Sequence, residues 1–162
     1  MKLLKEGARH VVAEGIALTD AEAMTVTLWG EGRSEPVDGR IAIGSVIRNR
    51  LHTRRWGNTY AKVCLWPWAF SCWRREGGLH NYEATLEMAK ALAMGRQVED
   101  PILRECAWIA HGIIGEWLQD RVAGATHYFS PQAMPKGKVP AWAMNQTPVL
   151  VLGEHIFYAR IA

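Results

Sequence analysis

The sequence predicts a helix-rich α+β fold in a single domain, with a small β-hairpin near the C-terminus. Three observations predict it. Apolar residues recur at spacings of three and four through much of residues 19–118, as expected of helices that bury one face. From Gly124 onward this period disappears, and two short β-type runs follow at residues 149–152 and 156–160. A chain of 162 residues is long enough to bury roughly 68–70% of its unfolded surface in one core.

The first clear helix follows an N-terminal lead-in of residues 1–18. Residues 19–22, Thr-Asp-Ala-Glu, have the pattern of a capping box, in which the Glu occupies the third helical position. We expect this helix to end at Gly30 and Gly32, because glycine is a weak helix former that is favoured at helix C-termini. The domain proper is therefore assigned to residues 19–162.

Further helices are predicted from capping residues and prolines. A long helix is expected after Pro36, a short one capped by Asn58, and another that begins at Asn81. Asp100 followed by Pro101 is the start signal of the last helix. The solvent-facing side of the long helix is expected to carry three arginines, Arg40, Arg48 and Arg54.

The composition is that of an ordinary globular protein. Apolar residues make up 49% and charged residues 22%, which excludes the disordered and collagen-like classes. The net charge of +3 is a mild bias toward anionic partners and weaker than the basic surface of a nucleic-acid binder, so no nucleic-acid partner is expected. The sequence carries no signal for a particular oligomeric state.

Cysteine usage indicates neither a disulfide framework nor a metal site. Cys64, Cys72 and Cys106 allow one bridge at most, and we interpret them as buried apolar groups. A zinc site made from Cys64, Cys72 and His80 lacks the short ligand spacing of chelating turns, so no metal is expected.

No part of the sequence predicts membrane insertion. No window approaches the run of about 18 apolar residues that a membrane span requires. Charge returns too soon after the N-terminus for a signal peptide. We therefore expect synthesis in the cytoplasm, with release by another protein if the target lies outside the membrane.

Tryptophan is abundant and clustered. Four of the eight Trp lie within residues 56–73, close to Tyr60 and Phe70. Indole offers a flat apolar face and one N–H donor, which suits a surface with one apolar and one wet side. Sugar rings present such a surface, and core packing is the alternative for each single Trp. Residues 66–73 are expected to form an ordered loop or a short β-segment.

Two glutamates in residues 29–36, Trp-Gly-Glu-Gly-Arg-Ser-Glu-Pro, are the first candidates for chemistry. Glu31 falls at the C-terminal end of one expected helix, where unpaired carbonyls disfavour an ionised carboxylate. Glu35 falls just before the next helix, where an anion is stabilised. Opposite environments of this kind are typical of a protonated general acid beside an ionised carboxylate. Two exposed loop charges are the alternative.

Several motifs together resemble a known family. Residues 31–36, Glu-Gly-Arg-Ser-Glu-Pro, precede a Gly, an apolar helix and Asn-Arg-Leu at 49–51. Phe-Ser-Cys-Trp at 70–73, Gly-Ala-Thr-His-Tyr at 124–128 and Trp142 follow in order. The ordered set resembles the cell wall hydrolase family typified by the spore cortex-lytic enzyme.

The resemblance implies a lysozyme-like catalytic domain, related in architecture to the resuscitation-promoting factors. Such a domain cuts peptidoglycan glycan strands between N-acetylmuramic acid and N-acetylglucosamine without a cofactor. The resemblance further implies that Glu31 is the acid/base of a lytic transglycosylase, in which the 6-hydroxyl of muramic acid replaces water. The sequence departs from the family at Ala69, where Gln is common, and at Gly30 and Gly32, where Ala is more usual.

Five further residues are candidates for substrate binding. His127 and Tyr128 have polar tips on an expected loop, which could bind an N-acetyl group or position the acid. Phe70, Trp73 and Trp142 are candidates for lining a groove. A packed aromatic ring, or a histidine with its hydrogen bonds satisfied, is the alternative at these positions. The lack of a signal peptide and of a separate wall-binding domain favours a phage-type endolysin released through a holin.

Three other hypotheses use the same residues. Glu31 and Glu35 together would make a hydrolysing muramidase. Cys72 and His127 would be the nucleophile and base of a cysteine peptidase or amidase that acts on the peptide stems. A non-catalytic wall-binding module would explain the Trp content, but it predicts binding to peptidoglycan without degradation.

Overall fold

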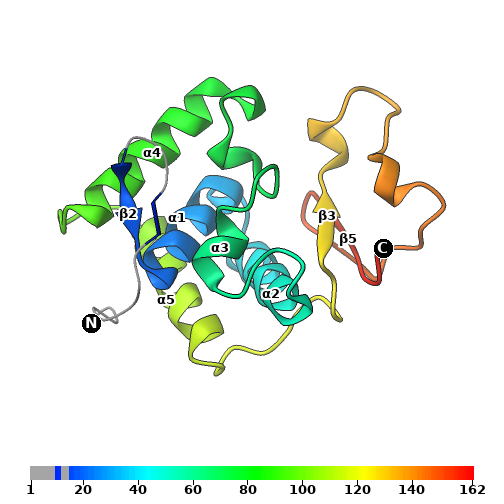
Figure 1. Cartoon of the computed structure of the whole chain (residues 1–162). Helices are drawn as coiled ribbons and strands as arrows, with labels where there is room; N and C mark the ends of the chain where they lie inside the picture. The colour runs from blue at the N-terminus through cyan, green and yellow to red at the C-terminus, as the bar shows by residue number, and fades with distance from the viewer. Residues whose placement is uncertain (1–9, 12–14) are drawn as a thin grey trace.

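The computed structural model describes residues 10–11 and 15–162. They form a helical part and a smaller C-terminal part built on a three-stranded antiparallel sheet (Figure 1). The helices are α1 (Asp20–Gly32), α2 (Val37–Thr53), α3 (Tyr60–Cys64), α4 (Leu79–Ala93) and α5 (Pro101–Ile114). The strands are β1 (His10–Val11), β2 (Ala17–Leu18), β3 (His127–Phe129), β4 (Leu150–Leu152) and β5 (His155–Tyr158). The predicted helix-rich α+β fold is confirmed.

Short 3-10 helices and one small β-pair complete the described structure. The 3-10 helices include η2 (Ser71–Trp73), η3 (Arg75–Gly77), η4 (Pro131–Ala133) and η5 (Ala141–Ala143). The predicted loop or β-segment at 66–73 is therefore a turn that leads into η2. Of the predicted lead-in, residues 1–9 and 12–14 lie outside the described residues, and β1 pairs with β2 antiparallel.

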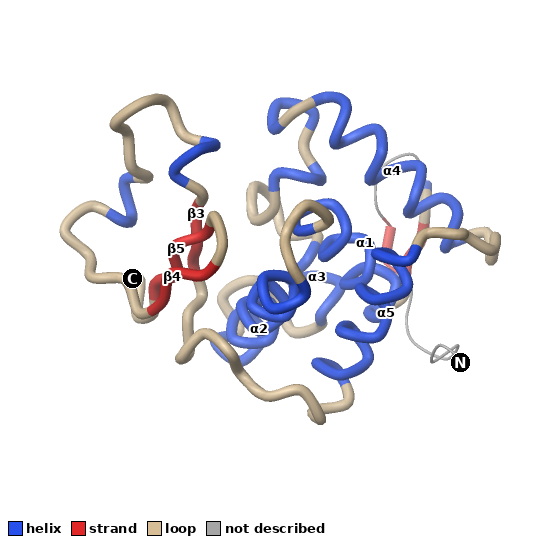
Figure 2. The backbone as a smooth tube through the Cα atoms, turned by 180° about the vertical axis from the view of Figure 1, so that it is seen from behind, coloured by secondary structure: helices blue, strands red, loops and turns tan. Residues whose placement is uncertain are grey.

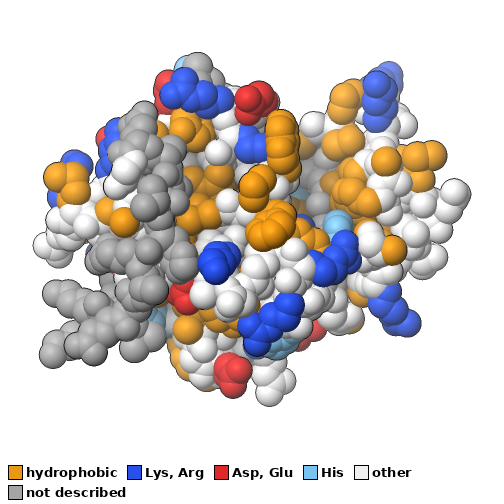
Figure 3. Space-filling view, in the orientation of Figure 1, with side chains coloured by type: hydrophobic (Ala, Val, Ile, Leu, Met, Phe, Trp, Pro, Cys, Tyr) orange, Lys and Arg blue, Asp and Glu red, His pale blue; other side chains and the backbone are white. Residues whose placement is uncertain are grey.

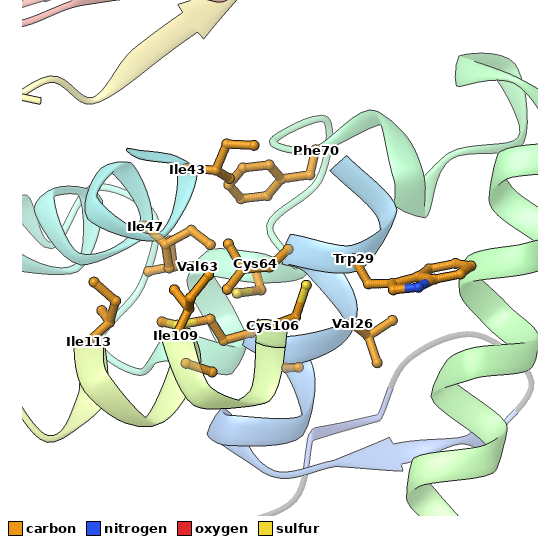
Figure 4. Packing of buried hydrophobic residues seen from close by; sticks show 14 of the residues in the cluster. Val26, Trp29, Ile43, Ile47, Val63, Cys64, Phe70, Cys106, Ile109 and Ile113 are labelled. Atoms are coloured by element: carbon orange, nitrogen blue, oxygen red, sulfur yellow. The ribbon is translucent and has the colours of Figure 1, made fainter. Parts of the chain in front are cut away.

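α1 is the central helix of the helical part. Its residues Met24, Val26 and Leu28 are fully buried, and α2, α3, α4 and α5 all pack against it. In Figure 4, labelled residues of α2, α3 and α5 pack on one side of α1, whereas Trp29 points away from them toward α4. Burial of each large apolar side chain contributes about 1.5–3 kcal/mol. The end of α1 is consequently held firmly by its neighbours.

Two helix starts follow the predicted capping chemistry. The Oγ1 atom of Thr19 accepts a hydrogen bond from the Glu22 amide at 3.2 Å. The Oδ1 atom of Asp100 accepts from the Ile102 amide at 2.9 Å. In both places a short polar side chain satisfies a backbone donor that has no partner within the helix.

Other helix boundaries differ from the prediction. Thr59 caps α3 in place of Asn58, because the Thr59 hydroxyl lies within reach of the first-turn amides. α4 begins two residues before Asn81. α1 continues through Gly30 and ends at Gly32. Gly30 therefore lies inside the helix, at a position where neighbouring elements leave no room for a side chain, as described below.

The prediction that α2 carries three arginines into solvent is wrong for Arg40. This side chain is 6% exposed and donates to the backbone carbonyls of Gly32 and Glu35. It also forms an ion pair of 2.5 Å with Glu105 of α5. Arg40 therefore satisfies carbonyls at the α1–α2 connection that no helical hydrogen bond uses. Arg54 is exposed, as predicted.

The C-terminal sheet has the strand order β3-β5-β4. β4 and β5 form the predicted hairpin, with Leu150 opposite Phe157. β3 is not predicted by the sequence; it pairs antiparallel with β5 and places Tyr128 opposite Phe157. A strand of three residues is too short for its alternation to be recognised, so its position depends on the partner strand.

α2 presents one apolar face to each part of the molecule. Ile43 and Ile47 lie in the helical core, whereas Ala42 and Val46 pack with Phe157 of β5 in a second cluster. Neighbouring residues on a helix lie about 100° apart, so the two sets form separate stripes. The view from behind also shows the sheet beside α2 (Figure 2). None of the helices in the described ranges is long and apolar enough to span a bilayer.

Candidate active site

A groove of about 820 Å³ lies between the helical part and the C-terminal sheet. Figure 3 shows this hollow, with hydrophobic side chains on both sides of it. The end of α1 and residues 66–69 contribute one wall, and β3 with the β4–β5 turn contributes the other. Glu31 and Glu35 both line the groove. Its size and its mixture of aromatic and polar walls suit an extended polar ligand.

Glu31 lies in the last turn of α1 and is held by three hydrogen bonds. Its Oε1 atom accepts from the Ser71 hydroxyl at 3.2 Å and from the Cys72 amide at 2.9 Å. Its Oε2 atom accepts from the Tyr128 hydroxyl at 2.9 Å. The partners come from η2 on one side and β3 on the other, so the carboxyl group is fixed by both parts of the molecule.

Tyr128 is a protonated partner of Glu31. Burial and the neighbouring Glu31 carboxylate raise the pKa of Tyr128 well above its ordinary value of 10.0. A neutral phenol can donate a hydrogen bond to a carboxylate and accept one from a carboxylic acid. Tyr128 can therefore form a hydrogen bond with Glu31 whether the Glu31 carboxyl group is ionised or protonated. A residue that donates a proton and later accepts one needs such a partner.

Gly30 allows the close approach that brings the η2 amide to Glu31. A Cβ atom at Gly30 would lie 2.7 Å from Cys72 Cβ and 2.8 Å from Thr85 Oγ1. The Asn81 side-chain amide also donates to the Gly30 carbonyl at 3.2 Å. The departure from the family pattern at this position thus has a structural reason, because α1 packs against η2 and α4 with no space for alanine.

Glu35 is engaged by a histidine from the sheet. Its side chain is buried just before α2, and its Oε1 atom lies 3.4 Å from His155 Nδ1. The His155 ring meets the Tyr128 ring edge-on, with centroids 4.9 Å apart. The absence of a side chain at Gly153 leaves space for the Glu35 carboxylate, since a Cβ atom on Gly153 would lie 2.6 Å from Glu35 Oε2. Glu31 and Glu35 are thus linked through Tyr128 and His155.

An aromatic cluster forms part of the sheet wall. The His127 ring lies 5.5 Å from the Trp56 ring and 4.9 Å from the Trp142 ring, measured between centroids. Burial and the positive charges of Arg50 and Arg55 lower the pKa of His127 from 6.5 to about 4. His127 is consequently a neutral aromatic residue of the wall at neutral pH.

The structure brings five of the seven predicted site residues to the groove. These are Glu31, Glu35, His127, Tyr128 and Trp142. Phe70 and Trp73 do not line it. Phe70 is 3% exposed and packs in the helical core, and the Trp73 indole donates to Thr27 Oγ1 at 2.9 Å. Both residues line a smaller neighbouring cavity instead.

Several groove residues were not singled out from the sequence. The Phe-Ser-Cys-Trp motif was noticed, but not that Ser71 and the Cys72 amide bind Glu31. His155 carries no local signal, because its partner Glu35 is distant in sequence. Arg50 was not proposed as a site residue, yet its buried side chain, 6% exposed, lines the groove and donates to the Thr126 carbonyl at 2.7 Å.

The cysteines lack the features of nucleophiles. Cys72 is fully buried, and burial raises the pKa of its thiol well above 9.0. Burial likewise raises the pKa of Cys64 and Cys106 to about 12. His127 Nδ1 pairs with Thr126 Oγ1 at 2.9 Å rather than with a thiol. Among the residues that the structure describes, no three potential ligands are grouped for a metal ion.

Comparison with known proteins assigns the family. Residues 34–158, most of the chain, match the family model described as Cell Wall Hydrolase. The chain belongs to the cell wall hydrolase family. The matched range includes Glu35 and strand β3 with Tyr128, and it begins three residues after Glu31. The resemblance found in the sequence motifs is confirmed.

Curated relatives of this cell wall hydrolase are spore cortex-lytic enzymes. The protein from Halalkalibacterium halodurans is 28% identical over 94% of this chain and 38% of its own length. The protein from Oceanobacillus iheyensis is 27% identical over 90% of this chain and 44% of its own length. The chain thus spans less than half the length of these relatives.

Two solved structures share the fold. The catalytic domain of the Bacillus cereus SleB protein matches with a TM-score of 0.57 and 25% identity, over 94% of this chain and 99% of that domain. The catalytic domain of the germination-specific lytic transglycosylase SleB from Bacillus anthracis matches with a TM-score of 0.55 and 25% identity, over 91% of this chain and 99% of that domain.

Proposed function

We propose that this chain cleaves the glycan strands of peptidoglycan between N-acetylmuramic acid and N-acetylglucosamine by lytic transglycosylation, with residues 19–162 as the catalytic domain. Its family membership and its likeness to a whole catalytic domain of a lytic transglycosylase support the proposal. The groove has a volume of about 820 Å³, and its aromatic wall suits sugar rings.

The observation that carries the proposal is the position of Glu31. Its carboxyl group lines the groove and is held by the Ser71 hydroxyl, the Cys72 amide and the Tyr128 hydroxyl. A general acid needs such fixed orientation, because proton transfer depends on hydrogen-bond geometry. Glu35 is the second carboxylate in the groove, but within the described residues its side chain has one polar contact, with His155 at 3.4 Å, against three hydrogen bonds for Glu31.

One carboxyl group is sufficient for this reaction. Glu31 donates its proton to the glycosidic oxygen, and the bond between that oxygen and C1 of the muramic acid breaks. The 6-hydroxyl of the same sugar then forms a bond to C1, and the Glu31 carboxylate accepts the hydroxyl proton. The products are a 1,6-anhydromuramic end and a free 4-hydroxyl on the N-acetylglucosamine, and Glu31 returns to its starting form.

His127, Tyr128 and Trp142 are proposed to contact the glycan from the sheet wall. All three line the groove, and the neutral His127 ring lies between Trp56 and Trp142. Delivery through a holin, as for a phage-type endolysin, stays a prediction. Detection of the protein in the periplasm of cells without a pore-forming lysis protein would contradict it.

The test is mass spectrometry of purified peptidoglycan digested by the wild type and by Glu31→Gln. This substitution keeps the size of the side chain and removes the proton that can be donated. We expect anhydromuramic ends from the wild type and a loss of about 10²–10⁴-fold in their rate of release from the variant. Circular dichroism and thermal unfolding check that both proteins fold equally.

Glu35→Gln and Cys72→Ser separate the other mechanisms. Reducing muramic ends that disappear in Glu35→Gln would indicate a hydrolysing muramidase. Cleaved stems on intact glycan that disappear in Cys72→Ser would indicate a cysteine peptidase or amidase. Binding to peptidoglycan without any cleavage would indicate a wall-binding module. Each of these results contradicts the proposed transglycosylation.

A further inference from the structure

A second cavity of about 310 Å³ adjoins the groove and is not explained by glycan cleavage alone. The two cavities share the turn at residues 66–68, Trp-Pro-Trp, as well as Arg74 and Glu76. Trp66 is 43% exposed and Trp68 is 72% exposed. We call this second cavity the side pocket. It is lined by aromatic residues and by both Arg74 and Arg75.

The two arginines of the side pocket lack acidic partners. The Arg74 guanidinium lies 4.8 Å from the centroid of the Trp68 ring, and the Arg75 guanidinium lies 5.4 Å from that of Tyr82. Within the described part of the chain, neither forms a hydrogen bond or ion pair through its side chain, and the buried Arg74 Nε atom has no partner. Glu76 adds one negative charge, so the side pocket remains positive.

The side pocket lies close to the proposed acid. Arg74 follows η2 directly, and the Ser71 hydroxyl and Cys72 amide of η2 bind Glu31. Three residues span at most about 11 Å of extended chain, which bounds the distance between the Cα atoms of Ser71 and Arg74. A group attached to the sugar next to the cleaved bond can therefore reach the side pocket from the groove.

We propose that the side pocket binds the acidic peptide stem that the lactyl group of N-acetylmuramic acid carries. This inference rests on the proposed glycan cleavage. The stem is attached to the sugar whose C1 reacts, so it must leave the groove near Glu31. Its carboxylates match two unpaired guanidinium groups, which bind carboxylates through paired hydrogen bonds. Its short aliphatic side chains match the exposed faces of Trp66 and Trp68.

The proposal is tested by comparing two forms of one substrate. Purified glycan strands with stems, and the same strands after an amidase has removed the stems, are digested by the wild type and by the double variant R74A/R75A. We expect the double variant to lose roughly 10- to 100-fold in kcat/KM on stem-bearing strands, mainly through KM. On strands without stems its loss should be clearly smaller, and the single variant R75A, whose side chain does not line the groove, should remain within about twofold of the wild type there.

Two further variants serve as controls. R96A/R104A removes the same net charge at exposed positions outside the groove and the side pocket, and should leave kcat/KM on both substrates within about twofold. R74K/R75K keeps both positive charges but not the planar donor pairs, so it should recover only part of the loss on stem-bearing strands. Thermal unfolding of each variant checks the fold.

The outcomes distinguish this inference from the proposed function. Equal losses on both substrates, or no loss on either, would overturn stem binding while glycan cleavage stands. A loss in R96A/R104A as large as that in R74A/R75A would also overturn it, because the effect would then be one of net charge. A wild type that cleaves neither substrate would overturn the proposed function and stem binding together.

Discussion

Glu31 is oriented in part by η2, whose close approach to α1 depends on one glycine. Gly30 lets α1 approach Cys72 of η2 and Thr85 of α4 more closely than any other residue would allow. That approach places the Cys72 amide 2.9 Å from Glu31 Oε1. The same residue thus sets both the packing of α1 and the geometry of the proposed acid.

Gly30→Ala should destabilise the protein and reduce its activity. The added methyl group would meet Cys72 and Thr85 at less than 3.0 Å, so η2 must shift, at a cost of about 1–3 kcal/mol in the free energy of unfolding. The shift would weaken the hydrogen bond to Glu31. Urea unfolding and release of soluble muropeptides measure the two effects.

A second glycine provides the control for this prediction. Gly44 lies inside α2, away from Glu31, and a Cβ atom there would lie 3.2 Å from the Ile113 side chain. Gly44→Ala should leave the activity of the folded enzyme unchanged, whatever its effect on stability. Full activity and stability in Gly30→Ala would contradict the packing argument.

Among the elements, β3 contributes three residues to the sheet wall, and the sequence does not reveal it. The helices were predicted because their caps and apolar periods are local, as at Thr19 and Asp100. β3 has three residues and takes its register from β5, whose position depends on packing against α2. Glu31 and Tyr128 were both predicted as site residues, but their hydrogen bond could not be.

The contacts of Glu35 show the same difference between local and distant signals. Its position just before α2 was predicted, since Pro36 marks the start of that helix. Its pairing with His155 depends on the β4–β5 turn and on the space left by Gly153. Phe70 and Trp73 were predicted for the groove from their residue types, but the turn into η2 directs them toward the core and the side pocket.

His127 in β3 should make stability depend on pH between about 6.5 and 4. Its pKa is about 4 in the folded protein and near 6.5 when unfolded, so the unfolded state binds the additional proton over this interval. Stability should therefore fall as the pH decreases from 6.5 to 4 and level off below that. Because His127 is only half-buried, solvent screening limits the effect to the order of 1 kcal/mol.

The measurement compares the wild type with His127→Gln, which cannot take up this proton. Urea unfolding at several pH values gives the free energy of unfolding of each protein. The difference, wild type minus variant, should decrease from pH 7 to pH 4. A difference that stays constant over this range would show that His127 has the same pKa in the folded and the unfolded protein.

At the scale of the whole molecule, Arg50 joins the walls of the groove. It belongs to α2, donates to the Thr126 carbonyl at 2.7 Å just before β3, and donates to the Ala69 carbonyl at 3.4 Å. Its guanidinium also lies 4.9 Å from the ring centroids of Trp56 and Phe70. One buried cation therefore connects α2, the turn before η2 and the sheet.

Arg50→Met should lower the free energy of unfolding by about 2–4 kcal/mol. The substitution keeps an apolar chain between the two rings but leaves the buried Thr126 carbonyl without its donor. Glycan cleavage should fall as well, because the two walls lose their fixed spacing. Chemical unfolding and muropeptide release measure these changes, with exposed Arg54→Met as the control that should alter neither by much.

The hydrogen bond between Glu31 and Tyr128 also determines when the site can form during folding. The two residues are 97 positions apart, so closing this contact requires a large loop to be ordered first. The local helices can form rapidly, whereas pairing across such a separation is slow. A chain whose helices have collapsed but whose sheet has not yet docked would have no complete groove. We therefore expect the proposed cleavage activity to appear only after the sheet has docked on the helices.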